Sequence, residues 1–148
     1  MLFFRKIVCY EGGIMKFICP TFVMLPRKTK ADKKFSLNLN IYRNTHHSVL
    51  NQAKQIFNEQ LKSQLQGLSL EYPISITFQY FKPSKRISDK ANVISIVEKF
   101  FCDSLVKWGA IPDDNDNYIL YQMYLPTIYD KNNGRVEICI TEAKELKK

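Results

Sequence analysis

Polar side chains that could support metal-dependent chemistry recur in residues 89–116, DKANVISIVEKFFCDSLVKWGAIPDDND. The first part of this segment is expected to be helical, and each residue of a helix advances by about 100°. At that spacing four polar residues share one helix face, within an arc of roughly 80°: Asp89, Asn92, Lys99 and Asp103. The segment therefore places two carboxylates, an amide and an amine on one side of a helix.

A turn after this helix adds two further carboxylates, Asp113 and Asp114. Hard divalent cations prefer oxygen ligands, and Mg²⁺ commonly takes one or two carboxylates together with waters and phosphate oxygens. Bound metal can activate water for attack on a phosphodiester. A nearby lysine such as Lys99 can neutralise the charge that develops on the phosphate. We therefore expect a Mg²⁺ site, with Mn²⁺ as the alternative ion, formed by Asp89, Asp103 and Asp114 with Asp113 close by.

The same residues also have structural interpretations. Asp89 follows a serine and could cap the N-terminus of the helix. Lys99 and Asp103 stand four residues apart, the spacing of an ordinary surface ion pair. Asp113 and Asp114 are good turn formers. Spacing alone leaves the structural and the catalytic interpretations open.

The segment resembles the RusA family of Holliday-junction resolvases. That family carries an Asp-x-Asp-Asn motif at the start of a helix, a lysine before an Asp-Ala-Leu-like stretch, a glycine and a pair of aspartates. The matching pieces here are residues 89–92, Lys99, residues 103–105, Gly109 and residues 113–114. Residues 134–141 resemble the closing strand of the family. The resemblance covers roughly residues 72–141.

The resemblance implies a metal-dependent endodeoxyribonuclease that cuts branched DNA such as four-way junctions, acting as a homodimer with one metal site for each strand. Asp89, Asp103, Asp114 and Lys99 would be catalytic, and Asn92 would orient a ligand or a water. Two departures stand out. Ala91 replaces the second aspartate of the motif, and the stretch from Asn92 to Lys99 is about one helical turn longer. The alternative is a catalytically inactive RusA-like protein that binds nucleic acid.

The charge of the chain also favours a polyanionic partner. The 148 residues contain 22 Lys and Arg against 14 Asp and Glu, a net charge of +8. Cations that neutralise phosphates release condensed counterions, which stabilises the complex. The expected DNA contacts fall in residues 26–34, in residues 82–86 and before the first long helix: Arg27, Lys28, Lys30, Lys33, Lys34, Arg43, Lys82, Lys85 and Arg86.

The elements expected to position these residues alternate between strand and helix. Apolar periodicity predicts strands at 16–25, 72–81, 118–125 and 135–141, and helices from about 45 to 67 and from 89 to 107. Residues 130–134 have the composition of a hairpin turn with Asn133-Gly134 at its centre. The pattern predicts an α+β fold, β-α-β-α-β-β, in which two main helices pack on a mixed sheet.

The N-terminal residues lack the order of a secretory signal, in which cations precede a longer apolar core. No stretch is long and apolar enough for a transmembrane helix, so we expect a cytoplasmic protein without a membrane partner. We expect one domain over residues 15–148, with residues 1–14 as an extension. Four cysteines without metal-site spacing are expected to be reduced, buried thiols: Cys9, Cys19, Cys102 and Cys139.

Overall fold

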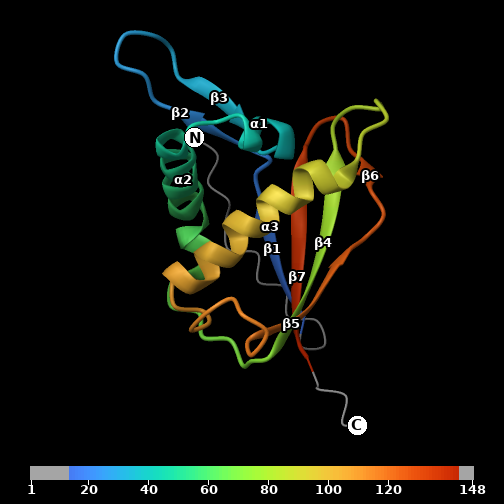
Figure 1. Cartoon of the computed structure of the whole chain (residues 1–148). Coiled ribbons are helices and arrows are strands. Elements are labelled where there is room, and N and C mark those ends of the chain that lie inside the picture. Colours follow the sequence, from blue (N-terminus) through green and yellow to red (C-terminus); the bar gives the residue numbers. More distant parts are fainter. Residues whose placement is uncertain (1–13, 144–148) are drawn as a thin grey trace.

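The computed structural model describes residues 14–143. These residues form an α+β fold, as the sequence predicts (Figure 1). The elements are β1 (Met15–Cys19), β2 (Phe22–Leu25), β3 (Lys33–Ser36), α1 (Leu39–Arg43), α2 (His47–Leu65), β4 (Ile74–Lys82), α3 (Lys90–Lys107), β5 (Ile119–Tyr124), β6 (Ile128–Tyr129) and β7 (Arg135–Glu142). The predicted extension, apart from Ile14, and Cys9 lie outside the described residues.

The main sheet is mixed, with strand order β1-β7-β4-β5, and β6 also pairs with β4. β4 is parallel to β5 and β6 and antiparallel to β7. β1 is antiparallel to β7. Every second residue of β4, from Ile74 to Tyr80, is buried, which is the alternation expected of a strand with one face on a core. β4 is therefore the central strand of the fold.

The apolar segment predicted as one strand at 16–25 forms two strands. Pro20 separates them, because proline lacks the N–H group that a continuous ladder needs. β1 joins the main sheet, whereas β2 pairs with β3 in a separate antiparallel hairpin. The basic segment 26–34, expected to be a loop, contributes its last two residues to β3.

The prediction of a hairpin around residues 130–134 is wrong. The strands before this turn, β5 and β6, pair with β4, and β7 pairs with the other edge of β4. Turn-forming residues report only local backbone preference, whereas pairing both edges of β4 satisfies its main-chain N–H and C=O groups. Gly134 is needed for a close approach, because a Cβ atom there would lie 2.9 Å from Cγ of Pro83.

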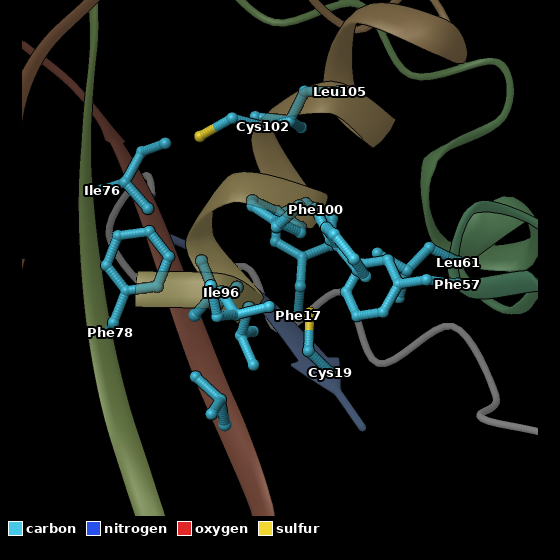
Figure 2. Close-up of a cluster of buried hydrophobic side chains, with 14 of the residues drawn as sticks. Phe17, Cys19, Phe57, Leu61, Ile76, Phe78, Ile96, Phe100, Cys102 and Leu105 are labelled. Atoms are coloured by element: carbon cyan, nitrogen blue, oxygen red, sulfur yellow. The ribbon is translucent and has the colours of Figure 1, made fainter. Parts of the chain in front are cut away.

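The core lies between the sheet and the two long helices. Figure 2 shows side chains from β4, β1 and α2 gathered around α3. The Phe100 ring lies 5.5 Å from that of Phe57 and the Phe101 ring 5.7 Å from that of Phe17, centre to centre. Ile96, the apolar residue within the polar arc of the sequence, is 2% exposed. A buried core residue therefore interrupts the polar face of α3.

Two buried amides fix α2 against its neighbours. The Asn58 side chain accepts a hydrogen bond from Ser104 of α3, and its main-chain carbonyl accepts one from Nε1 of Trp108 at 3.0 Å. The Gln64 amide bonds both the N–H and the carbonyl of Ile18, at 3.0 and 2.9 Å. These bonds set the position of α2 beside α3 and β1. None of the helices in residues 14–143 combines the length and apolarity that a membrane span requires.

Candidate functional site

A cleft of about 400 Å³ lies beside α3, between α1, β5 and the turn that follows the helix. It brings together three of the residues predicted from the sequence, Lys99, Asp103 and Asp114. Its walls are Leu39, Tyr42, Ser95, Ile96, Glu98, Lys99, Cys102, Asp103, Asp114 and Gln122. We call it the acidic cleft.

The pKa of the Cys102 thiol depends on the charges around the acidic cleft. Burial raises the pKa of this thiol to about 12, with further contributions from the charges of Glu98, Asp114 and Asp103. Three carboxylates, two from α3 and one from the following turn, therefore act on one buried group. Since only a thiolate is strongly nucleophilic, Cys102 is a packing residue at neutral pH, as is Cys19, whose pKa burial also raises.

Glu98 is the residue of the acidic cleft that the sequence argument missed. Its Oε1 accepts a hydrogen bond from Nε2 of Gln122 at 2.8 Å, whereas Oε2 is buried without a hydrogen bond of regular geometry from a described residue. Burial raises the pKa of Glu98, and the nearby Tyr124 hydroxyl partly opposes the rise. Glu98 lies about 180° around the helix from Asp89. A charged residue on a largely buried helix side was the signal available in the sequence.

The predicted lysine and aspartate of α3 do not pair with each other. Nζ of Lys99 lies 5.9 Å from the centre of the Tyr42 ring, a cation–π arrangement. The carboxylate of Asp103 instead pairs with Lys54 of α2 at 2.7 Å. Lys99 is therefore left without a carboxylate partner among the described residues and is exposed at the cleft.

Asp89 does not reach the acidic cleft. It caps α3, with Oδ1 accepting a hydrogen bond from the N–H of Ala91 at 2.9 Å. Fourteen residues separate it from Asp103, and at 1.5 Å per residue that is about 21 Å along the helix axis. The expected convergence of Asp89 with Asp103 and Asp114 therefore does not occur. Asn92 lies near the same end of α3 as Asp89 and is also absent from the cleft walls.

Asp113 shapes the turn after α3. Its two carboxylate oxygens accept hydrogen bonds from the N–H of Asp114 at 2.8 Å and from the side chain of Asn115 at 3.0 Å. Its neighbour Asp114 borders the acidic cleft, and the Asp114 carboxylate accepts no hydrogen bond from a described residue. The two adjacent aspartates thus differ, one bonded within the turn and one facing the cleft.

The acidic cleft suits a hard cation only with help from other ligands. Within residues 14–143 no three His, Cys, Asp or Glu side chains lie close enough to form a metal centre on their own. Mg²⁺ commonly needs only one or two carboxylates and completes its shell with waters and substrate oxygens. Asp103 and Asp114, with the half-buried Glu98 nearby, have the oxygen chemistry for such a partial site.

The cations expected to contact DNA form two groups. Arg27, Lys33 and Lys34 line a second cleft, of about 640 Å³, between the β2–β3 hairpin and the helices α1 and α2. Lys28 and Lys30 are exposed in the same segment but outside the walls of the cleft, and Arg43 is exposed at the end of α1. We call this second space the basic cleft.

The second basic group follows β4. Lys82 ends that strand, Lys85 lies with Nζ 5.3 Å from the centre of the Tyr129 ring, and Arg86 is exposed. In Figure 1 the β2–β3 hairpin and the loop after β4 lie at the upper end of the molecule, and the acidic turn 113–117 lies at the lower end. The expected DNA contacts therefore share one end of the fold.

No protein-family model matches this chain, and a search of curated proteins finds no significant match.

Proposed function

We propose that this protein is a Mg²⁺-dependent endonuclease that cuts branched DNA and that the acidic cleft is its active site. The observation that carries the proposal is that Glu98, Asp103 and Asp114 line one cleft together with Lys99. Carboxylates next to a free lysine form a site that can hold a divalent cation and a phosphate together.

Each side chain has a distinct part in this mechanism. Asp103 and Asp114 would hold the Mg²⁺ ion, or Mn²⁺ as the alternative. A bound divalent ion supplies an activated water and stabilises the leaving oxygen. Glu98 accepts a proton from the attacking water, because a carboxylate with a raised pKa is a better base. Lys99 neutralises the charge on the scissile phosphate.

The substrate class rests on the resemblance and on the placement of the cations. Two basic groups at one end of the fold, the basic cleft and the loop after β4, can each contact a different DNA arm. The homodimer that the resemblance implies would present two acidic clefts to one four-way junction. Symmetric cutting of such a junction requires two active sites.

The central test compares two adjacent aspartates. Asp114→Asn is expected to lower the rate of junction cleavage at least about 100-fold, because it removes a carboxylate ligand while keeping a good turn former. Binding of the junction should stay equal or become tighter, since a negative charge near the phosphates is lost. The measurement is nicking of a synthetic four-way junction with Mg²⁺, alongside binding with a chelator present.

Asp113→Asn is the matched control, since it removes the same charge from the same turn. Its carboxylate bonds the turn and does not border the acidic cleft. It should therefore cut at close to the wild-type rate. An Asp114→Asn protein that cuts as fast as the Asp113→Asn protein would refute the site.

A second candidate function is binding of nucleic acid without cleavage. The ion pair between Lys54 and Asp103, which already satisfies one expected ligand, favours it, as does Ala91 in place of the family aspartate. This candidate predicts that the wild-type protein binds the junction and leaves it intact with either Mg²⁺ or Mn²⁺. The cleavage assay on the wild type therefore separates the two functions.

A further inference from the structure

We propose that the basic cleft binds an unpaired nucleotide of DNA, with the phosphate at its cationic rim and the base on its apolar floor. The inference builds on the proposed function, because it names the part of a branched DNA that this surface recognises. The basic cleft lies between the β2–β3 hairpin and the first turn of α2, and its walls do not overlap those of the acidic cleft. Figure 1 shows the hairpin projecting beyond α2 at this end of the molecule.

The rim of the basic cleft carries cations without counterions. Arg27, Lys33 and Lys34 all line it, and its walls include no acidic side chain. None of these three cations forms an ion pair with a described residue. A concave surface with uncompensated positive charge favours an anion, and phosphate oxygens match both guanidinium and ammonium groups.

Contacts within the hairpin position two of these cations before any ligand arrives, Arg27 beside the cleft and Lys34 against Phe22, a ring that lies outside the cleft walls. Nε of Arg27 donates a hydrogen bond to the carbonyl of Ala31 at 2.8 Å, which leaves its terminal nitrogens for another acceptor. Nζ of Lys34 lies 4.4 Å from the centre of the exposed Phe22 ring. Side chains that are already positioned lose less conformational freedom when a ligand binds.

The floor of the basic cleft is apolar. Leu25 and Phe35 are buried beneath it, and Ile41 stands at its edge with 41% of its surface exposed. An apolar side chain left open beside a cationic rim suits a ligand with one charged end and one flat, weakly polar face. A nucleotide has this form, because the base is a stacking surface attached to a phosphate.

Polar groups on the opposite wall can meet the edge of a base. Gln52 lines the cleft and makes no hydrogen bond to a described residue. His46 caps α2 through Nδ1, which accepts the N–H of Ser48 at 3.2 Å, so Nε2 is the nitrogen left as a donor. Base edges carry both donors and acceptors and can satisfy such groups.

The size of the cleft and the nature of its floor select an unpaired strand over a duplex. A volume of about 640 Å³ is typical of a small-ligand pocket. A duplex can offer its phosphates to the rim, but its bases remain stacked and cannot reach the floor. An unpaired nucleotide next to a branch point can use both parts of the cleft.

The test measures binding of the full-length protein to a labelled 15-nucleotide oligothymidylate and to a 15-base-pair duplex, with chelator present throughout. The double variant Lys33→Gln/Lys34→Gln should weaken single-strand binding about tenfold. The matched control, Lys28→Gln/Lys30→Gln, removes two charges from the same segment outside the cleft. It should weaken binding of the single strand and of the duplex by the same factor, which should be smaller than tenfold.

The variant Ile41→Ala separates the contribution of the apolar floor to binding from that of the cationic rim. This variant should weaken single-strand binding about threefold and leave duplex binding and the salt dependence unchanged, because it removes apolar contact and no charge. Ile41 is 41% exposed and lies outside the buried core, so the variant should fold, which its thermal melting curve checks. Equal effects of the two lysine pairs on the single strand, or no effect of Ile41→Ala, would overturn the proposal.

Two further outcomes of the binding experiment distinguish a nucleotide from an acidic peptide and the nucleotide site from the nuclease. Displacement of the oligothymidylate by polyglutamate of equal charge, as effective as displacement by unlabelled strand, would contradict the proposal and indicate an acidic peptide as the ligand. Because binding is measured without metal, the result does not depend on the acidic cleft. A wild-type protein that binds the unpaired strand through this cleft and fails to cut junctions would refute the nuclease and support the nucleotide site.

Discussion

The three carboxylates of the acidic cleft have different surroundings. Glu98 is half-buried and shares its hydrogen bond with Gln122. Asp103 is paired with Lys54, and Asp114 is exposed at the mouth of the cleft. Carboxylates in different environments can take different catalytic parts. In the proposed mechanism this difference favours Glu98 as the proton acceptor and the aspartates as the metal ligands.

Glu98→Gln should stabilise the protein at neutral pH, measured by urea unfolding with chelator present. Burial disfavours the charged form of Glu98 and raises its pKa above the ordinary 4.5. The contribution of a group with a raised pKa is most favourable below its unfolded value and is lost as the pH rises through its folded value. The gain should be below about 1 kcal/mol at pH 7, because solvent reaches the half-buried group.

The pH dependence provides the check on this prediction. The difference in stability between Glu98→Gln and the wild type should shrink as the pH falls through 4.5 and below, where Glu98 becomes protonated in both the folded and the unfolded state. Gln can still offer an oxygen to Gln122, so the existing hydrogen bond is kept. A difference that is the same at pH 4.5 and at pH 7 would show that packing, and not charge, separates the two proteins.

At the scale of elements, α2 depends on one buried glutamine. Gln64 is 3% exposed and bonds both main-chain groups of Ile18 on β1, the outer strand of the main sheet. A side-chain amide that donates and accepts in this way completes the open edge of a strand as a neighbouring strand would. The polar residue on the buried face of α2 therefore covers an edge that would otherwise be unpaired.

Gln64→Leu should lower the free energy of unfolding by about 2–4 kcal/mol. The substitution removes the partners of the N–H and the carbonyl of the half-buried Ile18, and each unsatisfied buried group costs about 1–3 kcal/mol. Chemical denaturation measures the loss. Gln60→Leu on the exposed side of the same helix is the control and should change stability by less than about 0.5 kcal/mol. Equal effects of the two substitutions would contradict the role of Gln64 at the strand edge.

At the scale of the whole molecule, the net charge of +8 is unevenly distributed. The β2–β3 hairpin and the loop after β4 carry cations at one end, whereas the acidic turn 113–117 lies at the other. A field of this shape orients a polyanion before contact. The arrangement would direct the proposed DNA substrate toward the basic end of the fold.

Replacing Lys28, Lys30, Lys33 and Lys34 together with Gln should flatten the salt dependence of junction binding. Each phosphate contact contributes about 0.9 to the slope of log K against log salt, so the slope should fall by up to about 3–4. Binding titrations over a range of salt concentrations measure it. All four lysines are exposed, so the fold should persist. A slope equal to that of the wild type would mean that the hairpin does not touch the phosphates.

The sequence by itself determined the local elements and the character of the surface. Apolar periodicity located both long helices to within two residues at each end, and it located the strands around Ile76, Met123 and Ile138. Periodicity works here because each element buries one face on a single core. The exception is the segment 16–25, where Pro20 divides the predicted single strand into two.

Tertiary structure alone decided which strands pair and which carboxylates meet. Asn133-Gly134 has the local chemistry of a hairpin, but β4 lies between the flanking strands because it needs a partner on both edges. Asp89 and Asp103 share a direction around α3 but not a height along it, because fourteen residues of helix hold them about 21 Å apart. Glu98 and Asp114 lie sixteen residues apart in sequence, and the reversal of the chain at Gly109, with a φ of 77°, brings them to one cleft. Direction on a helix can be calculated from sequence, whereas proximity depends on how the chain turns back and packs.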